Sequence, residues 1–151
     1  MSSESLPSEH ATAVPSAADR VALIVEDTAD LRILFARELA DAGFTVVEAC
    51  DGPAALEQAH RFAPQAILLD LMLPGINGFN VARLLRDDKR TRGAAIVAVT
   101  ALASERLRIS ALEAGCDLFI RKPVAAGDVV EQLIRLLEQR RAPPGASPAN
   151  H

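Results

Sequence analysis

The sequence predicts an α/β protein built on a doubly wound, five-stranded parallel sheet with five helices. Short apolar runs alternate along the chain with segments whose apolar residues recur at helical spacing, a pattern typical of βα units joined by right-handed crossovers. Several runs are apolar throughout, which indicates strands covered on both faces. Five strands at this spacing favour the order 2-1-3-4-5, because the glycine fingerprint of the longer dinucleotide-binding arrangement is missing after the first strand.

Five segments rich in aliphatic residues are the predicted strands. The third is apolar until a single carboxylate, Asp70, ends it, and Pro74 prevents further strand. The predicted strands are residues 21–25, 45–49, 66–69, 94–99 and 117–120.

A predicted helix follows each strand. The first begins after Thr28 or Asp27, either of which can cap it, and stops before Gly43. The second follows Pro53, and the fourth ends at Gly115. The apolar positions that define the five helices are, in chain order, Leu31, Leu34, Phe35 and Leu39; Ala55, Leu56, Ala59 and Phe62; Val81, Leu84 and Leu85; Leu107, Ala111 and Leu112; and Val129, Val130, Leu133, Ile134 and Leu137.

One domain is expected, over residues 20–141. Its flanks, 1–19 and 142–151, are rich in Ser, Ala and Pro without apolar periodicity, so we expect them to be disordered. Cys50 and Cys116 are isolated, which favours two reduced, buried thiols and a cytoplasmic location. Neither a signal peptide nor a membrane-spanning segment is visible.

The charge balance argues against nucleic acid or an anionic membrane as a partner. The chain has 16 Lys and Arg residues against 20 Asp and Glu residues, a net charge of −4. Basic residues do gather on the third helix and the loop after it, where we expect a solvated face. They are Arg83, Arg86, Lys89, Arg90 and Arg92.

Acidic residues follow two of the predicted strands. Glu26 and Asp27 come after the first strand and Asp70 after the third, so the predicted strand order brings them to one edge of the sheet. Two like charges 4 Å apart repel by about 4 kcal/mol at an effective dielectric of 20, which calls for a cation or raised pKa values. Oxygen ligands favour Mg²⁺, Mn²⁺ or Ca²⁺ over zinc. Taken alone, Glu26 and Asp27 would fit helix capping equally well.

Two hydrogen-bond donors are predicted at the same edge. Thr100 follows the fourth strand and Lys122 the fifth, and a hydroxyl and an ammonium are donors that suit phosphoryl oxygens. Each residue taken separately is common at a strand end or on a surface.

In combination these residues resemble the receiver domain of two-component response regulators, which has a flavodoxin-like (CheY-like) fold. The resemblance covers roughly residues 20–141. It rests on Glu26-Asp27, Asp70 with Pro74 and Gly78, Thr100-Ala101, and Lys122-Pro123.

The resemblance implies that Asp70 is the phosphoacceptor. Its carboxylate would attack a phosphohistidine of a histidine kinase or a histidine phosphotransfer protein. Asp27, Asp70 and the backbone carbonyl of Met72 would hold Mg²⁺, or Mn²⁺, with Glu26 acting directly or through water. Such a protein is a phospho-acceptor switch that catalyses only its own phosphorylation and dephosphorylation.

The resemblance also implies a conformational switch. Lys122 would pair with the phosphoryl group, Thr100 would move to hydrogen-bond it, and Phe119 is the aromatic switch residue. These movements would reshape the face of the fourth helix, fifth strand and fifth helix. A cis peptide is expected before Pro123. Since no output domain is visible, we expect a stand-alone regulator acting by protein contact on a downstream protein.

Three further positions bear on lifetime and docking. Met72 and Leu102 stand where the family tunes phosphoryl lifetime, and both are apolar, which predicts slow self-dephosphorylation. Ile33 lies off the apolar stripe of the first helix, so it is a candidate contact for a kinase helix.

Two other functions share parts of this pattern. A flavin-binding module has the same fold, but the chain contains no Trp or Tyr to stack on a flavin. An aspartyl-phosphate phosphatase also uses a nucleophilic Asp, but its second acid would fall at Met72.

Overall fold

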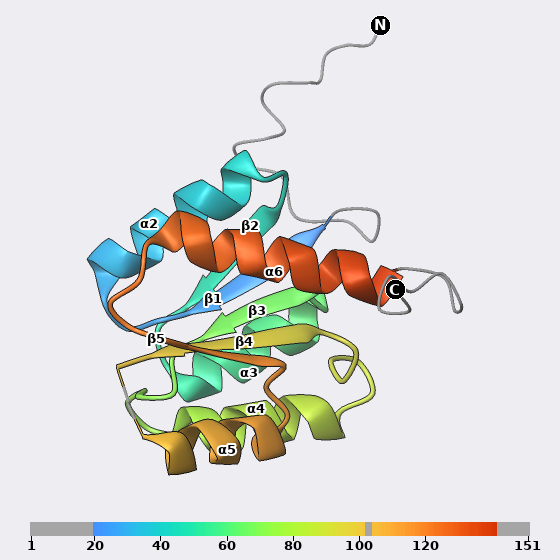
Figure 1. The fold of residues 1–151 in the computed structure, drawn as a ribbon. Helices are drawn as coiled ribbons and strands as arrows, with labels where there is room; N and C mark the ends of the chain where they lie inside the picture. The colour runs from blue at the N-terminus through green and yellow to red at the C-terminus, as the bar shows by residue number, and fades with distance from the viewer. Residues whose placement is uncertain (1–19, 102–103, 142–151) are drawn as a thin grey trace, which may run out of the picture.

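A computed structural model describes residues 20–101 and 104–141 and shows the alternation that the sequence predicts (Figure 1). Residues 1–19 and 142–151, both predicted as disordered arms, and Leu102 lie outside the described residues. The elements are β1 (Val21–Val25), α2 (Ala29–Asp41), β2 (Thr45–Ala49), α3 (Gly52–Phe62), β3 (Ala66–Leu69), α4 (Gly78–Asp87), β4 (Ala95–Thr100), α5 (Glu105–Ala114), β5 (Leu118–Arg121) and α6 (Ala126–Arg141).

The strands form one parallel sheet in the order β2-β1-β3-β4-β5, which confirms the predicted topology. Helices α2 and α6 cover one face of the sheet, and α3, α4 and α5 cover the other (Figure 1). Alternate residues of β1 therefore enter different cores: Leu23 packs on the α3–α5 side and Ile24 on the α2–α6 side. Burial on both faces explains why the central strands are continuously apolar.

The structure departs from the predicted bounds at the last two strands, which begin and end one residue later than expected. Asp117 directly precedes β5 and contacts β4. Its carboxylate accepts a hydrogen bond from the Ile96 N–H at 2.9 Å, and its own N–H donates to the Ile96 carbonyl at 2.7 Å. The side chain thus takes a backbone donor of β4 at the start of the strand pair.

The two cysteines differ in burial, so the prediction that both are buried is correct for Cys116 and wrong for Cys50. Cys116 is buried, and burial raises the pKa of its thiol to about 12, so it is an inert core residue. Cys50 is exposed, contrary to prediction, because it lies in the turn between β2 and α3. Three apolar helix positions are also exposed, at the margins of their stripes: Leu34, Leu84 and Leu112.

The predicted solvated basic face is wrong at Arg86. Its guanidinium points inward from α4 and donates to the carbonyls of Gly115 at 2.8 Å and Ala94 at 2.6 Å, and to the Asp117 carboxylate at 2.8 Å. A further bond at 2.6 Å reaches the Arg92 carbonyl. Arg86 therefore connects α4 to the loops that precede β4 and β5.

Among the helices of the described residues, none combines the length and the apolar character that a membrane-spanning helix needs.

Candidate functional site

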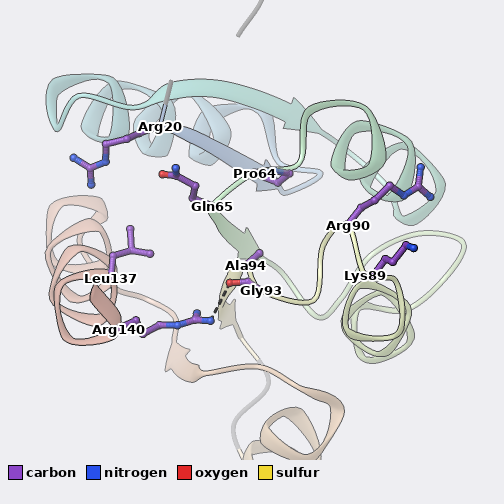
Figure 2. A pocket seen from close by; sticks show the side chains of 9 residues that line it. All are labelled: Arg20, Pro64, Gln65, Lys89, Arg90, Gly93, Ala94, Leu137 and Arg140. Carbon is purple, nitrogen blue, oxygen red and sulfur yellow. Dashed lines mark hydrogen bonds between the residues drawn. The ribbon is translucent and has the colours of Figure 1, made fainter. Parts of the chain in front are cut away.

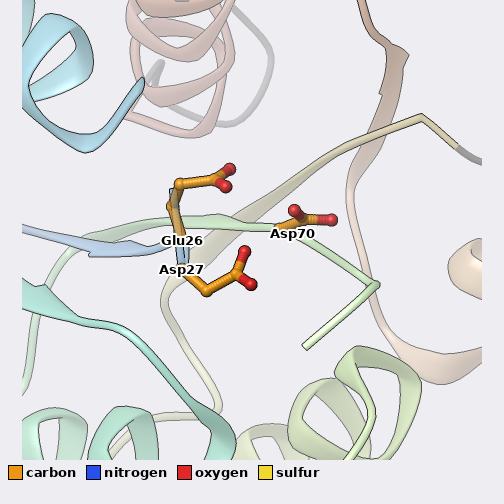
Figure 3. Close-up of side chains that lie close together, drawn as sticks. All are labelled: Glu26, Asp27 and Asp70. Carbon is orange, nitrogen blue, oxygen red and sulfur yellow. The ribbon is translucent and has the colours of Figure 1, made fainter. Parts of the chain in front are cut away.

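Three carboxylates meet at the carboxyl edge of the sheet (Figure 3). Glu26 and Asp27 directly follow β1, and Asp70 directly follows β3, its neighbour in the sheet. The ladder continues past the strand ends, since the Asp70 N–H donates to the Val25 carbonyl at 3.0 Å. One oxygen from each acid lies within 4.8 Å of the others. The strand order therefore brings together the three acids that the sequence placed at this edge.

Lys122 joins two of these acids. Its ammonium lies 2.9 Å from Glu26 Oε1 and 3.1 Å from Asp70 Oδ2, although both acids are almost fully buried. Burial by itself lowers the pKa of Lys122, but the hydrogen bonds to Glu26 and Asp70 outweigh it and raise the pKa above its usual value. The Lys122–Pro123 peptide is cis, as expected from the resemblance. Lys122 is therefore a charged donor held inside the acidic cluster.

Backbone N–H groups orient the two buried carboxylates. The Met72 N–H donates to Asp70 Oδ1 at 2.9 Å, and the Thr28 N–H donates to Glu26 Oε2 at 3.2 Å. Each carboxylate thus has one oxygen on a backbone donor and the other on Lys122. The Asp70 side chain is held by hydrogen bonds before any ligand arrives.

Asp27 differs from the other two acids. Its carboxylate is exposed and has no hydrogen bond or ion pair with any residue of the described chain. The N-cap residue of helix α2 is Thr28, so helix capping does not explain the presence of Asp27. Three carboxylates around one ammonium leave two negative charges uncompensated. An all-oxygen donor set of this charge fits a hard divalent cation such as Mg²⁺.

The remaining sequence candidates lie around this cluster. Thr100 ends β4 fully buried, and its carbonyl accepts from the Lys122 N–H at 2.8 Å, which holds the two residues at one edge. Phe119 is half-buried in β5 and packs against the core on the α3–α5 side. The Met72 side chain is 54 % exposed beside Asp70. The structure therefore places Met72 and Thr100 in contact with Asp70 and Lys122, and Phe119 in the core on the α3–α5 side.

Two residues support the site in ways that the sequence does not predict. Arg32 donates to the Glu26 carbonyl at 2.8 Å and fixes the turn after β1, but its position on α2 carries no distinguishing signal. In the sequence, Gly78 belongs to the motif on which the resemblance to receiver domains rests, and nothing there indicates its packing role. A Cβ there would lie 2.5 Å from Leu71 Cα and 2.8 Å from the Asp70 carbonyl oxygen. Glycine is therefore required for α4 to begin against the backbone that carries Asp70.

An apolar pocket of about 380 Å³ adjoins the cluster, between α2 and the loop after β5. Leu31, Phe35 and Pro123 line it together with the stem of Lys122. Ile33, on the same helix, is 54 % exposed. The lining of this pocket is therefore mostly apolar.

Comparisons with known proteins agree on one family. A family model for the response regulator receiver domain matches residues 22–134. Over 103 residues the chain is 45% identical to the response regulator PleD of Caulobacter vibrioides, which covers 68% of this chain and 22% of PleD. It is also 39% identical over 131 residues to the phosphate regulon transcriptional regulatory protein PhoB of Pseudomonas aeruginosa, covering 84% of this chain and 55% of PhoB. The chain thus spans only part of these curated relatives.

Solved structures match over nearly their whole length. The receiver domain of a sensor histidine kinase of Pseudomonas aeruginosa PAO1 superposes with a TM-score of 0.72 at 30% identity, covering 80% of this chain and 99% of that chain. That crystal structure has a magnesium ion coordinated in its active site cleft. A putative response regulator of Chloroflexus aurantiacus gives a TM-score of 0.73 at 28% identity, covering 80% of this chain and 98% of that one.

Proposed function

The chain belongs to the response regulator receiver domain family, and from this premise we propose that Asp70 accepts a phosphoryl group from a phosphohistidine. The donor is a histidine kinase or a histidine phosphotransfer protein. The observation that carries the proposal is the buried Asp70 carboxylate, held between the Met72 N–H and the Lys122 ammonium beside two further acids. A carboxylate oriented in this way is ready to act as a nucleophile.

The transfer requires little from the protein beyond positioning and charge. An Asp70 oxygen forms a bond to phosphorus while the bond from phosphorus to the imidazole nitrogen breaks, and the electron pair of that bond stays on the imidazole. Lys122, already 3.1 Å from Asp70 Oδ2, would donate to the oxygens of the transferred group. The hydrogen bond from Met72 N–H keeps the carboxylate aligned during the attack.

We propose that Mg²⁺, or Mn²⁺, is held by Asp27 and Asp70 with the Met72 carbonyl, and by Glu26 directly or through water. When bound, the cation would supply positive charge that offsets the negative charge of the reacting groups. The support is the exposed Asp27 carboxylate, which has no partner among the described residues, and the two uncompensated negative charges of the cluster.

Mg²⁺ is expected to raise the melting temperature of the wild-type chain but not of Asp27→Asn. A cation that binds only the folded state stabilises it by about 2.7 kcal/mol at a concentration of 100 times its Kd. Removing the Asp27 charge takes away a ligand and also relieves repulsion, so in EDTA the variant should melt at or above the wild-type temperature. Thermal unfolding with MgCl₂ and with EDTA measures both effects.

Asp30→Asn is the matched control, because Asp30 is an exposed acid in the first turn of α2 outside the cluster. It should keep the full Mg²⁺-dependent shift. An equal shift in Asp27→Asn would contradict the proposed ligand set.

For the response to phosphorylation, we propose a population shift in which Thr100 moves to the phosphoryl group and Phe119 repacks. The affected face consists of α5, β5 and α6, where a downstream protein would bind. Docking of the kinase at Ile33 is supported by the exposure of that side chain on α2. We regard the chain as a phospho-acceptor switch in the cytoplasm, not as an enzyme with a separate substrate. That it acts alone by protein contact stays a prediction.

The acyl phosphate is expected to be long-lived, because Met72 is an exposed apolar side chain beside Asp70 and cannot orient an attacking water. Met72→Glu should shorten the lifetime by at least about tenfold, since general-base assistance is worth about 10²–10⁴-fold when well placed. Met72→Leu, which keeps the side chain apolar, should leave the lifetime unchanged. Loss of phosphoryl label in Mg²⁺ buffer measures it, and a wild-type half-life of only seconds would contradict the prediction.

A further inference from the structure

A second pocket lies at the amino ends of the central strands (Figure 2). Asp70, in contrast, follows the carboxyl end of β3 at the opposite edge of the sheet. Gln65 and Ala94 directly precede β3 and β4, and they lie between the last turns of α6 and the loop after α4. Its volume of about 800 Å³ lies in the range of small-molecule sites, about 300–1,000 Å³. The proposed phosphoacceptor chemistry does not use this pocket.

The pocket is strongly cationic although the chain is net acidic. Its lining includes Arg20, Lys89, Arg90 and Arg140, and no acid is among the residues that line it. Within the described chain, Arg20 and Lys89 form no ion pair with a carboxylate; the Arg20 guanidinium lies 4.4 Å from the Phe44 ring centroid. These two charges are therefore available to an anion.

Arg140 is positioned at the pocket but only partly neutralised. It donates to the Gly93 carbonyl at 2.9 Å, the dashed line in Figure 2. Its nearest acid, Asp117, is 3.5 Å away and already accepts from Arg86 and from the Ile96 N–H through the same oxygen. Arg90, in contrast, is paired with Asp88 through two hydrogen bonds and contributes less free charge.

We infer that this pocket binds a phosphate-bearing ligand of nucleotide size. Guanidinium groups such as those of Arg20 and Arg140 match phosphate oxygens. Leu137 and Pro64 add apolar surface, and the Gln65 amide adds a donor and an acceptor, which suits a base better than a bare inorganic anion. The inference is independent of the proposed phosphotransfer, because it involves none of the residues around Asp70.

The test is an NMR and calorimetric titration of the full chain with ATP, GTP, inorganic triphosphate and adenosine, in EDTA. The nucleotides should bind with a Kd below about 1 mM, more tightly than triphosphate, and adenosine should not bind. Amide shifts should concentrate at Gln65 and Gly93 and spare Met72. Affinity should fall as salt is raised, because the pocket is open to solvent and the Debye length shrinks to about 8 Å at physiological ionic strength.

Arg140→Gln should weaken nucleotide binding by about tenfold, the usual effect of losing a hydrogen bond between charged groups. Lys89→Gln, at an exposed side chain that has no ion pair with any described residue, should weaken nucleotide binding without affecting the fold. Arg135→Gln removes the same charge from an exposed position on α6 outside this pocket and should leave affinity unchanged. The inference is overturned by no nucleotide binding at ten times the expected Kd limit of about 1 mM, by equal losses in Arg135→Gln, or by shifts centred on Met72.

Discussion

Asp70→Asn is expected to abolish acyl phosphate formation. The amide cannot attack phosphorus as a carboxylate does, yet its carbonyl oxygen can still accept from the Met72 N–H. Lys122 would keep its contact with Glu26, so the site should stay assembled. Incubation with acetyl phosphate and Mg²⁺, followed by intact-mass spectrometry, should show one added phosphoryl group on the wild-type chain and none on the variant.

The melting temperature of Asp70→Asn shows whether this variant is folded, which is the control for the labelling result. Asp70→Asn removes one charge from a cluster with two uncompensated negative charges, so in EDTA its melting temperature should equal or exceed that of the wild type. Asp30→Asn, with an exposed acid on α2, should label normally. A phosphoryl adduct that persists in a folded Asp70→Asn chain refutes Asp70 as the phosphoacceptor.

The strands were predictable where burial leaves no choice of residue. The bounds of β1, β2 and β3 agree with the sequence prediction. In β1 and β3, which are central strands, both faces are covered and apolar residues run to the strand ends. The predicted β4 ends one residue early, before Thr100, because Thr100 is polar. In the structure Thr100 is buried and its carbonyl still accepts from the Lys122 N–H. A hydrogen-bond ladder depends on the neighbouring strand, which a single segment does not reveal.

The acidic site was predictable as a convergence but not as a set of contacts. Strand order alone brings Glu26, Asp27 and Asp70 to one edge. The bonds from Lys122 to Glu26 and Asp70 span 96 and 52 residues of sequence and depend on the conformation of a long side chain. The need for Gly78 is equally invisible in the sequence, because it arises from the close approach of α4 to the backbone after β3.

Arg86 shows where periodicity fails. A basic residue among other basic residues on a helix indicates a solvated face, and the neighbouring Arg83, Lys89 and Arg90 are indeed exposed. A guanidinium, however, offers five donors in a fixed plane, and Arg86 uses them on three carbonyls and the Asp117 carboxylate. Only the tertiary position of those acceptors distinguishes Arg86 from its neighbours.

Arg86→Met is therefore expected to lower the free energy of unfolding by about 2–4 kcal/mol. The substitution keeps an apolar stem but leaves the Gly115 and Ala94 carbonyls without the Arg86 donor, at about 1–3 kcal/mol for each group that stays buried. The Asp117 carboxylate loses its bond to Arg86 but still accepts from the Ile96 N–H. The side chains of Arg86 and Asp117 are 21% and 29% exposed, so water replaces part of what is lost and the sum is smaller than full burial implies. Urea unfolding at neutral pH measures the change.

Arg83→Met is the matched control for Arg86→Met, because Arg83 lies one turn earlier on α4, is exposed, and has a single hydrogen bond to Asn80 within the same helix. It should change stability by less than about 0.5 kcal/mol. A double-mutant cycle with Asp117→Asn separates the ion pair from the carbonyl contacts, since residues in direct contact typically couple by about 0.5–3 kcal/mol. If Arg86→Met and Arg83→Met were equally stable, the hydrogen bonds of Arg86 would contribute no more to stability than those of an exposed arginine.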